Sequence, residues 1–325
     1  MSEECLVSVL CTAFNHEQYI RQTLQSFVDQ QTDFPFEVLV NDDQSSDGTA
    51  EVIREFAEKY PAIIRPFYQE KNLFSRGIDI YHTVFYPTAR GKYVAMCEGD
   101  DYWTDNTKLQ RQVDFLEAHP EYSACVHNTM MHFCDGSRPD TPHRNPGGDC
   151  DVEMDKLIPG LEDAYHYSSL MAKKEIISVR PEFYYVGDSF GFTDYPEALW
   201  LRLHGPIHYI DRIMSVYRLN SNAAAWSSGV DGQYDKLVTF LTGEAAMLEA
   251  FRSYCPEEYR PLLEEYILRR KFELLYTQGR DREQRKPPYR ELLRAMPFRY
   301  RLNNFLKSYV PGLQRIYRRT KGYHE

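Results

Sequence analysis

The sequence predicts an α/β protein with a mostly parallel sheet flanked by helices. Three observations support this. Strand-like and helix-like patterns alternate over residues 1–130, acidic residues follow the ends of predicted strands, and 42% of the residues are hydrophobic against 26% charged. Such alternation is typical of a parallel sheet with helices on both faces, and the composition is that of an ordinary globular protein.

Short apolar runs predict the strands of the first half, and apolar residues at helical spacing predict the helices between them. The strands are expected at residues 6–11, 36–41, 62–68, 92–97 and 122–133. The helices are expected at residues 17–30, 49–59, 77–89 and 105–118, the last with Thr104 or Asp105 as its N-cap.

The second half of the chain changes character twice. Residues 134–160 are rich in Asp, Gly and Pro and are expected to form a long loop. A short strand is expected within 165–174, a helix over 193–205, and one or two strands over 206–219. From Gly232 onward the pattern is entirely helical. We therefore expect an α/β domain over residues 1–229 and a helical, basic C-terminal extension over residues 230–325.

The net charge of −10 is unevenly distributed along the chain. Residues 251–325 hold 18 Lys and Arg against 9 Asp and Glu, while the first 250 residues hold 20 against 39. An acidic body argues against nucleic acid as the main partner. The basic tail, with its interleaved aromatic residues, is suited to an anionic membrane surface, although a solvated surface is the simpler interpretation.

The sequence also bears on the cellular compartment. No run approaches 18 consecutive apolar residues, so no membrane-spanning helix is expected. Two acids, Glu3 and Glu4, precede the first apolar run, whereas a secretory signal carries positive charge there. Seven cysteines at irregular spacings do not suggest a disulfide framework. We expect a cytoplasmic protein, with peripheral contact at the inner face of the plasma membrane left open.

Pairs of aspartates follow two of the predicted strands. Asp42 and Asp43 come after the second strand, and Asp100 and Asp101 come after the fourth. Ligands of open parallel sheets collect beyond the carboxyl ends of the strands. Carboxylates alone would repel a phosphate group. A hard divalent cation prefers oxygen ligands, and once bound to the carboxylates it makes the interaction of the site with phosphate attractive. The sheet edge is therefore predicted to be a site for a metal ion and a diphosphate.

Other site classes lack their motifs. The chain contains no GxGxxG and no GxxxxGK[ST], which disfavours a nicotinamide-binding unit and a P-loop nucleotidase. Its histidines and cysteines do not follow the spacing of a structural zinc site.

Four stretches together resemble the family-two glycosyltransferases of the GT-A fold, a Rossmann-like nucleotide-diphospho-sugar transferase fold. They are VSVLCTAFNHEQYIRQTLQSFVDQ, FEVLVNDDQSSDGT, GKYVAMCEGDDYW and TDYPEALWLRLHGPIHYIDRIMSVYRL, and the resemblance covers roughly residues 5–225. It implies inverting transfer of a sugar from a nucleotide-diphosphate donor to a hydroxyl acceptor. The family further implies a role in the synthesis of a surface glycan: a lipopolysaccharide, capsule or exopolysaccharide.

The resemblance assigns roles residue by residue. The DXD-type element is Asp100 and Asp101, in which Asp101 would bind Mn²⁺ or Mg²⁺, and Asp194 matches the general base. The implied nucleotide-binding residues are Thr12, Ala13, Asn15, Asp43, Arg76 and Asp100; the candidate substrate or acceptor contacts are Trp103, His166 and Arg218. A UDP-sugar is the expected donor, with dTDP and GDP left open. Where the family often has a late histidine, this chain has Asn220.

Simpler structural roles remain open for several of these residues. Asp43 and Asp47 are also suited to turns and caps, and Asp194 to the N-terminus of the following helix. Trp103 could pack under a helix, and His166 could be a buried structural histidine. Two other classes of protein remain as alternatives: a non-catalytic nucleotide-sugar-binding or scaffold protein of the same fold, and a nucleotidyltransferase.

Overall fold

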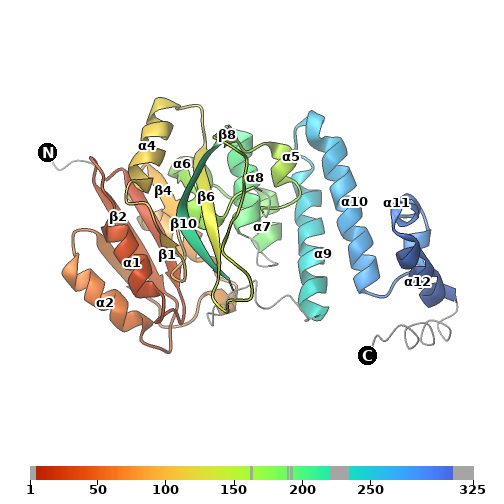
Figure 1. Ribbon diagram of the computed structural model, residues 1–325, viewed down its shortest axis with the longest axis horizontal. Helices are drawn as coiled ribbons and strands as arrows, with labels where there is room; N and C mark the ends of the chain where they lie inside the picture. Colours follow the sequence, from red (N-terminus) through yellow and green to blue (C-terminus); the bar gives the residue numbers. More distant parts are fainter. Residues whose placement is uncertain (1–4, 162–163, 189, 191–192, 220–233, 310–325) are drawn as a thin grey trace. The chain divides into compact units, whose positions relative to one another are not determined.

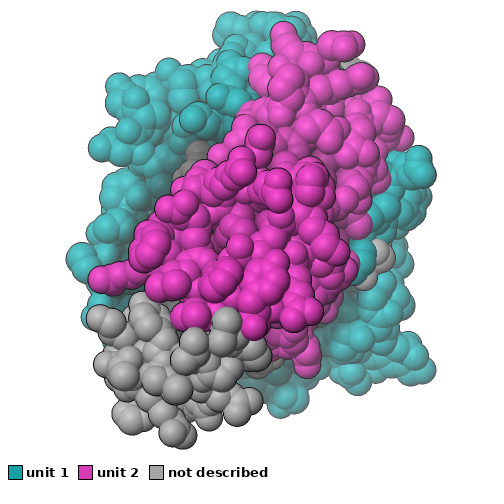
Figure 2. All heavy atoms as spheres, turned by 90° about the vertical axis from the view of Figure 1, so that its right-hand side faces the viewer, with its two compact units in different colours: residues 1–228 teal, residues 229–325 magenta. Residues whose placement is uncertain are grey.

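The computed structural model describes the chain except residues 1–4, 162–163, 189, 191–192, 220–233 and 310–325. The chain divides into two compact units, residues 1–228 and residues 229–325 (Figure 2). The predicted domain boundary after residue 229 lies outside the described residues.

The first unit is built on one curled sheet with the strand order β3-β2-β1-β4-β9-β6-β10-β5 (Figure 1). Its longer strands are β1 (Val7–Ala13), β2 (Phe36–Asp42), β3 (Ile64–Tyr68), β4 (Tyr93–Met96), β6 (Ala124–Phe133) and β10 (Ile207–Leu219). Strands β3, β2, β1 and β4 are parallel neighbours, as are β6 and β10. The short β9 (Met171–Lys173) lies antiparallel between β4 and β6 and joins the two parallel sets.

Three helices cover one face of this sheet. They are α1 (Ile20–Val28), α2 (Thr49–Lys59) and α4 (Lys108–Ala118). Alternate residues of β1, such as Val7, Val9 and Cys11, belong to one buried cluster with apolar residues of all three helices. Every second residue of the strand and the apolar face of each helix therefore pack in one common core.

Shorter elements fill the rest of the first unit. They are η1 (Phe74–Arg76), a π-helical turn η2 (Tyr81–Phe85), α3 (Tyr86–Thr88), α5 (Met154–Leu157), η3 (Tyr167–Ser169), α6 (Lys174–Ile177), α7 (Glu182–Asp188) and α8 (Asp194–His204). Helices α5, α6 and α7 each contact α8. Single-turn π-helices such as η2 occur frequently at functional sites.

The α/β prediction is confirmed, with one difference in the sheet. The parallel strands form where the apolar patterns place them, but the helix expected over 77–89 is the π-helical turn η2 followed by the short α3, and the N-cap of α4 is Thr107 rather than Thr104 or Asp105. The short strands β5 (Tyr102–Trp103), β7 (Thr141–Pro142), β8 (Cys150–Asp151) and β9 pair antiparallel. Two or three residues are too few to show a hydrophobic period. For the same reason the loop expected over 134–160 contains β7, β8 and α5. The segment 206–219 is one strand, with register shifts between Ile210 and Ser215.

The second unit is helical, as predicted. It contains α9 (Tyr234–Phe251), η5 (Glu257–Tyr259), α10 (Arg260–Thr277), η6 (Glu283–Arg285), α11 (Arg290–Ala295) and α12 (Phe298–Tyr309). A buried ion pair of 2.8 Å joins Glu244 of α9 to Arg270 of α10. In the described part of the chain, no helix has both the length and the apolar character needed to cross a membrane.

Candidate functional site

The two aspartate pairs meet at one edge of the sheet. Strands β2 and β4 lie on either side of β1 and run parallel to it, so the segments after them emerge together. The backbone N–H of Asp43 donates to the carbonyl of Ala13 at 2.9 Å, and that of Gly99 donates to the carbonyl of Thr12 at 2.8 Å. Both acidic segments are thereby fixed to the end of β1. Asp42, Asp43, Asp100 and Asp101 are all buried.

Asp101 has one satisfied and one unsatisfied carboxylate oxygen. Its Oδ1 accepts a hydrogen bond of 3.0 Å from the backbone N–H of Arg218. Its Oδ2 is buried without a hydrogen-bond partner and lies 3.9 Å from Nδ1 of His166. Burial, and next the neighbouring charge of Asp100, raise the pKa of Asp101 well above its usual value. A buried, unsatisfied acceptor is costly, so this oxygen is suited to receive a cation.

Arg218 supplies positive charge beside these acids. Its guanidinium donates to the carbonyl oxygen of Asp100 and, at 2.5 Å, to Oε1 of Gln22. The same group lies 4.5 Å from the ring centroid of Tyr102 and 4.9 Å from that of Tyr19, within the range of cation–π attraction. The side chain is held in place on all these sides, and its charge offsets the repulsion within the acidic cluster.

Gly99 lets the acidic segment approach the loop after β1. A Cβ atom at this position would lie 2.8 Å from Nδ1 of His16 and 3.1 Å from Cβ of Ala13. The glycine therefore serves close packing of two protein segments. Nε2 of His16 lies 3.9 Å from Oδ2 of Asp100, and burial lowers the pKa of this histidine. His16 is thus a member of the site that the sequence did not single out.

The Asp43 carboxylate orders a neighbouring loop. It accepts hydrogen bonds from the backbone N–H groups of Leu73, at 2.7 Å, and Phe74, at 3.0 Å. These residues begin the turn η1, whose last residue, Arg76, is exposed. The capping role considered for Asp43 is therefore present, and it places the loop of Arg76 beside the end of β2.

The loop after β1 is closed by side chains. Asn15 has a left-handed backbone with φ of 56°, its N–H donates to Oγ of Ser45, and its Oδ1 accepts from the N–H of Ser46. Asp47 accepts from the backbone N–H groups of Glu17 and Thr49, both at 3.1 Å. The turn role considered for Asp47 is therefore present.

Asp194 is the first residue of α8, and its Oδ1 accepts a 2.8 Å hydrogen bond from the N–H of Tyr195. It lies close enough to Glu98, at the end of β4, to affect that group. Glu98 has solvent access but is densely surrounded by protein. Crowding by protein around its carboxylate, then the charges of Asp100 and Asp194, raise the pKa of Glu98 above its ordinary value. The helix start considered for Asp194 therefore coexists with a place beside the acidic cluster.

Trp103 is packed inside the protein, and His166 is partly buried. Trp103 is 4% exposed, its indole N–H donates to the carbonyl of Ser168 at 3.0 Å, and its ring contacts Phe27. His166 stacks on Tyr217 at 4.0 Å, and burial lowers its pKa to about 3. Trp103 therefore packs under a helix, as the simpler interpretation of this residue expects. Of the neighbours Tyr102 and Trp103, only Tyr102 is partly exposed.

The site also contains residues that no motif indicated. Gln22 and Tyr19 contact Arg218, while Thr23 donates to the carbonyls of Gly99 and Asp101 at 2.9 and 2.5 Å. Along the sequence they lie within an ordinary amphipathic helix pattern. Their function follows only from the direction in which α1 presents them.

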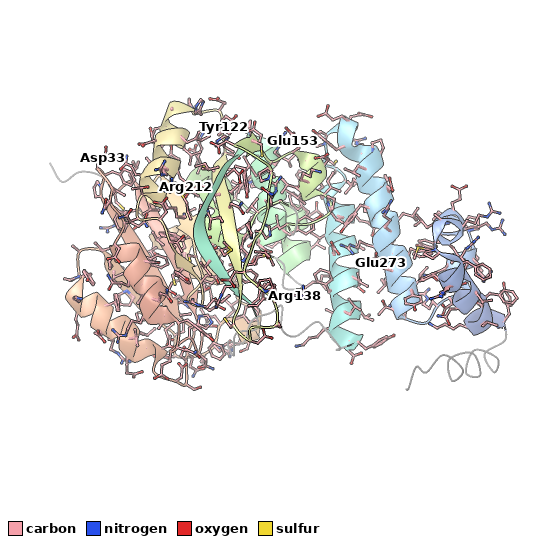
Figure 3. The ribbon with its side chains drawn as sticks, viewed as in Figure 1. Asp33, Tyr122, Arg138, Glu153, Arg212 and Glu273 are labelled. Carbon is pink, nitrogen blue, oxygen red and sulfur yellow. The ribbon has the colours of Figure 1, made fainter. Side chains whose placement is uncertain are left out.

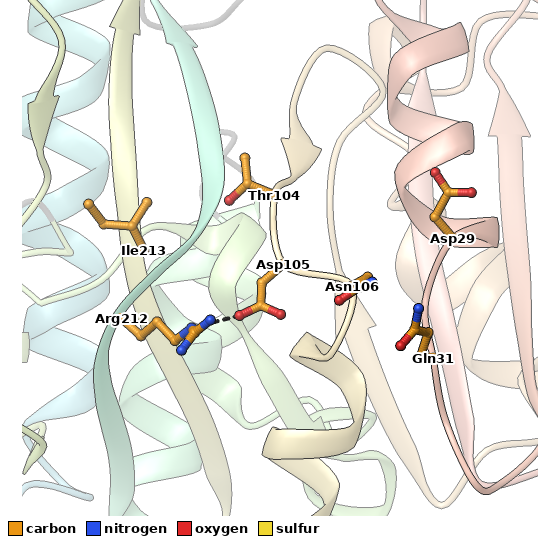
Figure 4. Close-up of a pocket in the computed structure, with 7 residues that line it drawn as sticks. All are labelled: Asp29, Gln31, Thr104, Asp105, Asn106, Arg212 and Ile213. Atoms are coloured by element: carbon orange, nitrogen blue, oxygen red, sulfur yellow. Dashed lines mark hydrogen bonds and ion pairs between the residues drawn. The ribbon is translucent and has the colours of Figure 1, made fainter.

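The first unit has a pocket of about 600 Å³ (Figure 4). It is lined by the end of α1, residues 104–106 and the middle of β10, where Arg212 donates to Asp105 at 2.6 Å. It contains none of the predicted site residues. The acidic cluster itself is closely packed in this structure.

Comparison with known proteins gives a consistent result. The family described as glycosyl transferase family 2 matches residues 8–176. An uncharacterized protein of Mycobacterium tuberculosis is 31% identical over 244 residues, which is 75% of this chain and 67% of that protein. The glucosyltransferase WfaP of Escherichia coli, named for transfer from UDP-Glc to α-D-GlcNAc-diphosphoundecaprenol, is 30% identical over 112 residues, 34% of this chain and 41% of WfaP.

Solved structures share the fold. Staphylococcus aureus TarS 1-349 in complex with UDP-GlcNAc aligns with a TM-score of 0.52 at 18% identity, covering 84% of this chain and 81% of that one. The mannosyltransferase PcManGT of Pyrobaculum calidifontis, in complex with GDP-Man and Mn²⁺, aligns with a TM-score of 0.50 at 18% identity, covering 93% and 84%. The chain therefore belongs to glycosyl transferase family 2 and is a glycosyltransferase with the GT-A fold.

Proposed function

We propose that this protein is an inverting glycosyltransferase that moves a sugar from a UDP-sugar to a hydroxyl acceptor during surface-glycan synthesis. The observation that carries the proposal is the unsatisfied Oδ2 of Asp101, buried beside Arg218 at the sheet edge that also holds Asp100 and Glu98, with Asp194 nearby. The name of WfaP supports the donor and the acceptor class, because it specifies UDP-Glc and a lipid-linked saccharide. Lipopolysaccharide, capsule and exopolysaccharide are the candidate products.

The residues present fit a divalent cation that is held jointly with a substrate. Among the described residues no group of three His, Cys, Asp or Glu side chains is arranged to hold a metal by itself. Mg²⁺ and similar ions are usually bound by one or two carboxylates together with substrate phosphates. Asp101, with Asp100 beside it, would supply the carboxylates, and PcManGT was solved with GDP-Man and Mn²⁺. When bound, such an ion stabilises negative charge on the leaving diphosphate.

The nucleotide would bind along the ends of β1 and β2. Thr12 and Ala13 end β1, Asn15 lies in the loop that follows, and Arg76 would approach from the loop that Asp43 holds. Asp43 already accepts two backbone hydrogen bonds. Each carboxylate oxygen has two acceptor positions, so this group retains capacity to meet a base edge. Arg218, whose guanidinium lies beside Asp100, would favour the negative charge of the diphosphate.

Asp194 would act as the general base. A sugar hydroxyl has a pKa far above neutral and must lose its proton during the attack. Burial raises the pKa of Asp194 above that of an ordinary aspartate, which makes the carboxylate a stronger base. A single displacement from the side opposite the diphosphate inverts the anomeric configuration and needs no enzyme nucleophile.

Thermal-shift measurements with UDP, dTDP and GDP, each with and without Mn²⁺, test the proposed site. We expect UDP with Mn²⁺ to stabilise the protein most, by about 2.7 kcal/mol at 100 times Kd. Asp101→Asn should abolish the effect of Mn²⁺, while Asp114→Asn, the same change at an exposed position of α4, should preserve it. A Mn²⁺ effect that survives in Asp101→Asn would contradict the proposed metal site.

The second unit supports a further part of the proposal, contact of a cytoplasmic enzyme with an anionic membrane. Helix α12 exposes Phe298, Phe305 and Tyr309 together with Arg299 and Arg301. Aromatic and cationic side chains on one short helix suit the interface of an anionic leaflet. The basic residues beyond 309 and the position of Asn220 lie outside the described residues. A lipid-linked acceptor would make such contact useful.

A further inference from the structure

The carboxyl group of Glu197 lies at the centre of a buried network on α8. Glu197 is 1% exposed and follows Asp194 by three residues, one turn along the same helix. Its Oε1 accepts a 3.0 Å hydrogen bond from the hydroxyl of Tyr86, and its Oε2 accepts one of 2.8 Å from the hydroxyl of Tyr167. Both carboxyl oxygens are therefore directed at fixed partners.

The two tyrosines come from segments that are far from α8 in the sequence. Tyr86 begins α3 and directly follows the π-helical turn η2. Tyr167 begins η3 and directly follows His166, whose Nδ1 lies 3.9 Å from the unsatisfied Oδ2 of Asp101. Glu197 thus connects the helix that carries Asp194 to the turn that borders Asp101.

The segment around η2, which carries Tyr86, is held in place by its own contacts. Asp79, just before η2, accepts hydrogen bonds from Tyr184 at 2.8 Å and Arg180 at 2.6 Å, and its Oδ2 lies 2.9 Å from Nδ1 of His82. The ring of Tyr81 contacts the rings of Phe85, Tyr86 and Tyr167, so it lies against both tyrosines that bind Glu197. Tyr86 is therefore held from several sides and offers Glu197 a fixed point.

Packing alone does not account for a carboxyl group in this position. A buried carboxyl carries a desolvation cost, and burial raises the pKa of Glu197 to about 8. An apolar side chain of similar size would avoid that cost. Two directed hydrogen bonds, unlike apolar contacts, fix both the rotation and the translation of the first turn of α8.

We propose that Glu197 is a positioning residue, which holds Asp194 at the correct place relative to Asp101 through Tyr86 and Tyr167. This inference rests on the proposed role of Asp194 as general base. Small displacements of a catalytic group are expensive, since about 1 Å can cost 100-fold in rate. Substrate binding would be spared, because Glu197 contacts none of the proposed nucleotide-binding residues.

The test compares Glu197→Ala and Glu197→Gln in the full chain, with the UDP-sugar that gives the largest thermal shift and UDP release as the assay. Glu197→Ala should lower kcat by about 10- to 100-fold and leave the Kd for UDP within about twofold. Glu197→Gln, which can still meet both tyrosine hydroxyls, should retain most of the activity. Glu153→Ala, at an exposed residue that Figure 3 labels, removes an ion pair to Arg202 of α8 and should leave kcat unchanged.

A double-variant cycle separates positioning from a general loss of structure. Asp194→Asn should be severely impaired, and adding Glu197→Ala to it should cause little further loss, because the group to be positioned is already gone. A full additional loss in the double variant, or a parallel fall in kcat and UDP affinity in Glu197→Ala, would overturn the positioning role. If Asp194→Asn alone retained wild-type kcat, the proposed base would be wrong, which is a distinct outcome.

Discussion

The backbone N–H of Arg218 donates a hydrogen bond of 3.0 Å to Oδ1 of Asp101, and the Arg218 guanidinium donates to the carbonyl of Asp100. The end of β10 is thereby tied to the segment that follows β4, 117 residues earlier in the chain. This relationship explains how a strand can end in a glutamate and two aspartates. The buried guanidinium of Arg218 offsets the repulsion between the carboxylates. Hydrogen-bond donors from Arg218 satisfy acceptor oxygens of Asp100 and Asp101.

Replacing Arg218 should weaken both the fold and the binding of nucleotide. Arg218→Met removes hydrogen bonds to Asp100 and Gln22, and hydrogen bonds of charged groups contribute about 1.5–3 kcal/mol each. We expect a loss of stability of at least about 2 kcal/mol in urea denaturation. We also expect a UDP affinity at least tenfold lower by calorimetry. Arg218→Lys should restore part of the UDP affinity, since it restores the charge. Unchanged UDP affinity in Arg218→Met would exclude a role at the diphosphate.

Asp43 should contribute to stability through the loop it holds. In Asp43→Ala the backbone N–H groups of Leu73 and Phe74 lose their acceptor, as at a helix whose N-cap is removed. Such losses cost about 0.5–2 kcal/mol. Asp43→Asn keeps one acceptor oxygen and should cost less. Denaturation of both variants, together with faster amide hydrogen exchange at residues 73 and 74, would verify the role. Identical exchange in Asp43→Ala and wild type would contradict it.

Lys108 should make folding stability depend on pH. Its side chain is fully buried, donates to Gln112 at 2.7 Å and lies 4.1 Å from the ring of Trp103. Burial lowers its pKa to about 7, whereas the unfolded value is about 10.4. Between these values the unfolded chain binds a proton that the folded chain does not. The contribution of Lys108 to stability therefore improves as pH rises, by up to about 1.4 kcal/mol per pH unit.

Lys108→Met removes this dependence. We expect its stability relative to wild type to be most favourable at pH 7 and below, and to decline steadily toward pH 10. Lys92→Met, the same change at a side chain that is 55% exposed, should show no such trend. Parallel stability curves for wild type and Lys108→Met between pH 7 and 10 would show that Lys108 is not held neutral.

Helix α12 should contribute to membrane binding if the exposed aromatic and basic residues act together. The test is a fourfold variant, in which Ser replaces Phe298 and Phe305, and Glu replaces Arg299 and Arg301. This variant should float less with vesicles that contain an anionic lipid. Flotation with purely zwitterionic vesicles should be weak for wild type as well. Replacing Arg252 and Arg269, which are paired with Glu264 and Glu265 on the same unit, controls for the loss of positive charge. Equal flotation of all three proteins with anionic vesicles would remove the membrane role of α12.

The parallel half of the fold could be predicted because its signals are local. Strand β2 and helix α2 form where a short apolar run and a 3.6-residue period place them, and two aspartates after a buried strand must emerge at the edge of the sheet. The arrival of the Asp43 and Asp101 segments at the same edge followed from the parallel direction of their strands. These features need no knowledge of side-chain direction.

The rest depends on long-range contacts that leave no local pattern. Strand β9 has only three residues, and its place between β4 and β6 is decided by its neighbours. Gln22 and Tyr19 look like ordinary surface positions of an amphipathic helix, although they hold Arg218, some 200 residues later. Glu197 sits in an apolar helix pattern, and nothing in that pattern indicates the two tyrosines it meets. Trp103 lies only two residues after Asp101, yet its indole turns inward to the carbonyl of Ser168.

The most direct measurement is the anomalous scattering of manganese in crystals of the protein grown with UDP and Mn²⁺. We predict one manganese peak within about 2.5 Å of a carboxylate oxygen of Asp101, bridging to the diphosphate, with the nucleoside beside Thr12 and Asn15. A diphosphate bound elsewhere, or a manganese peak that does not involve Asp101, would contradict the account.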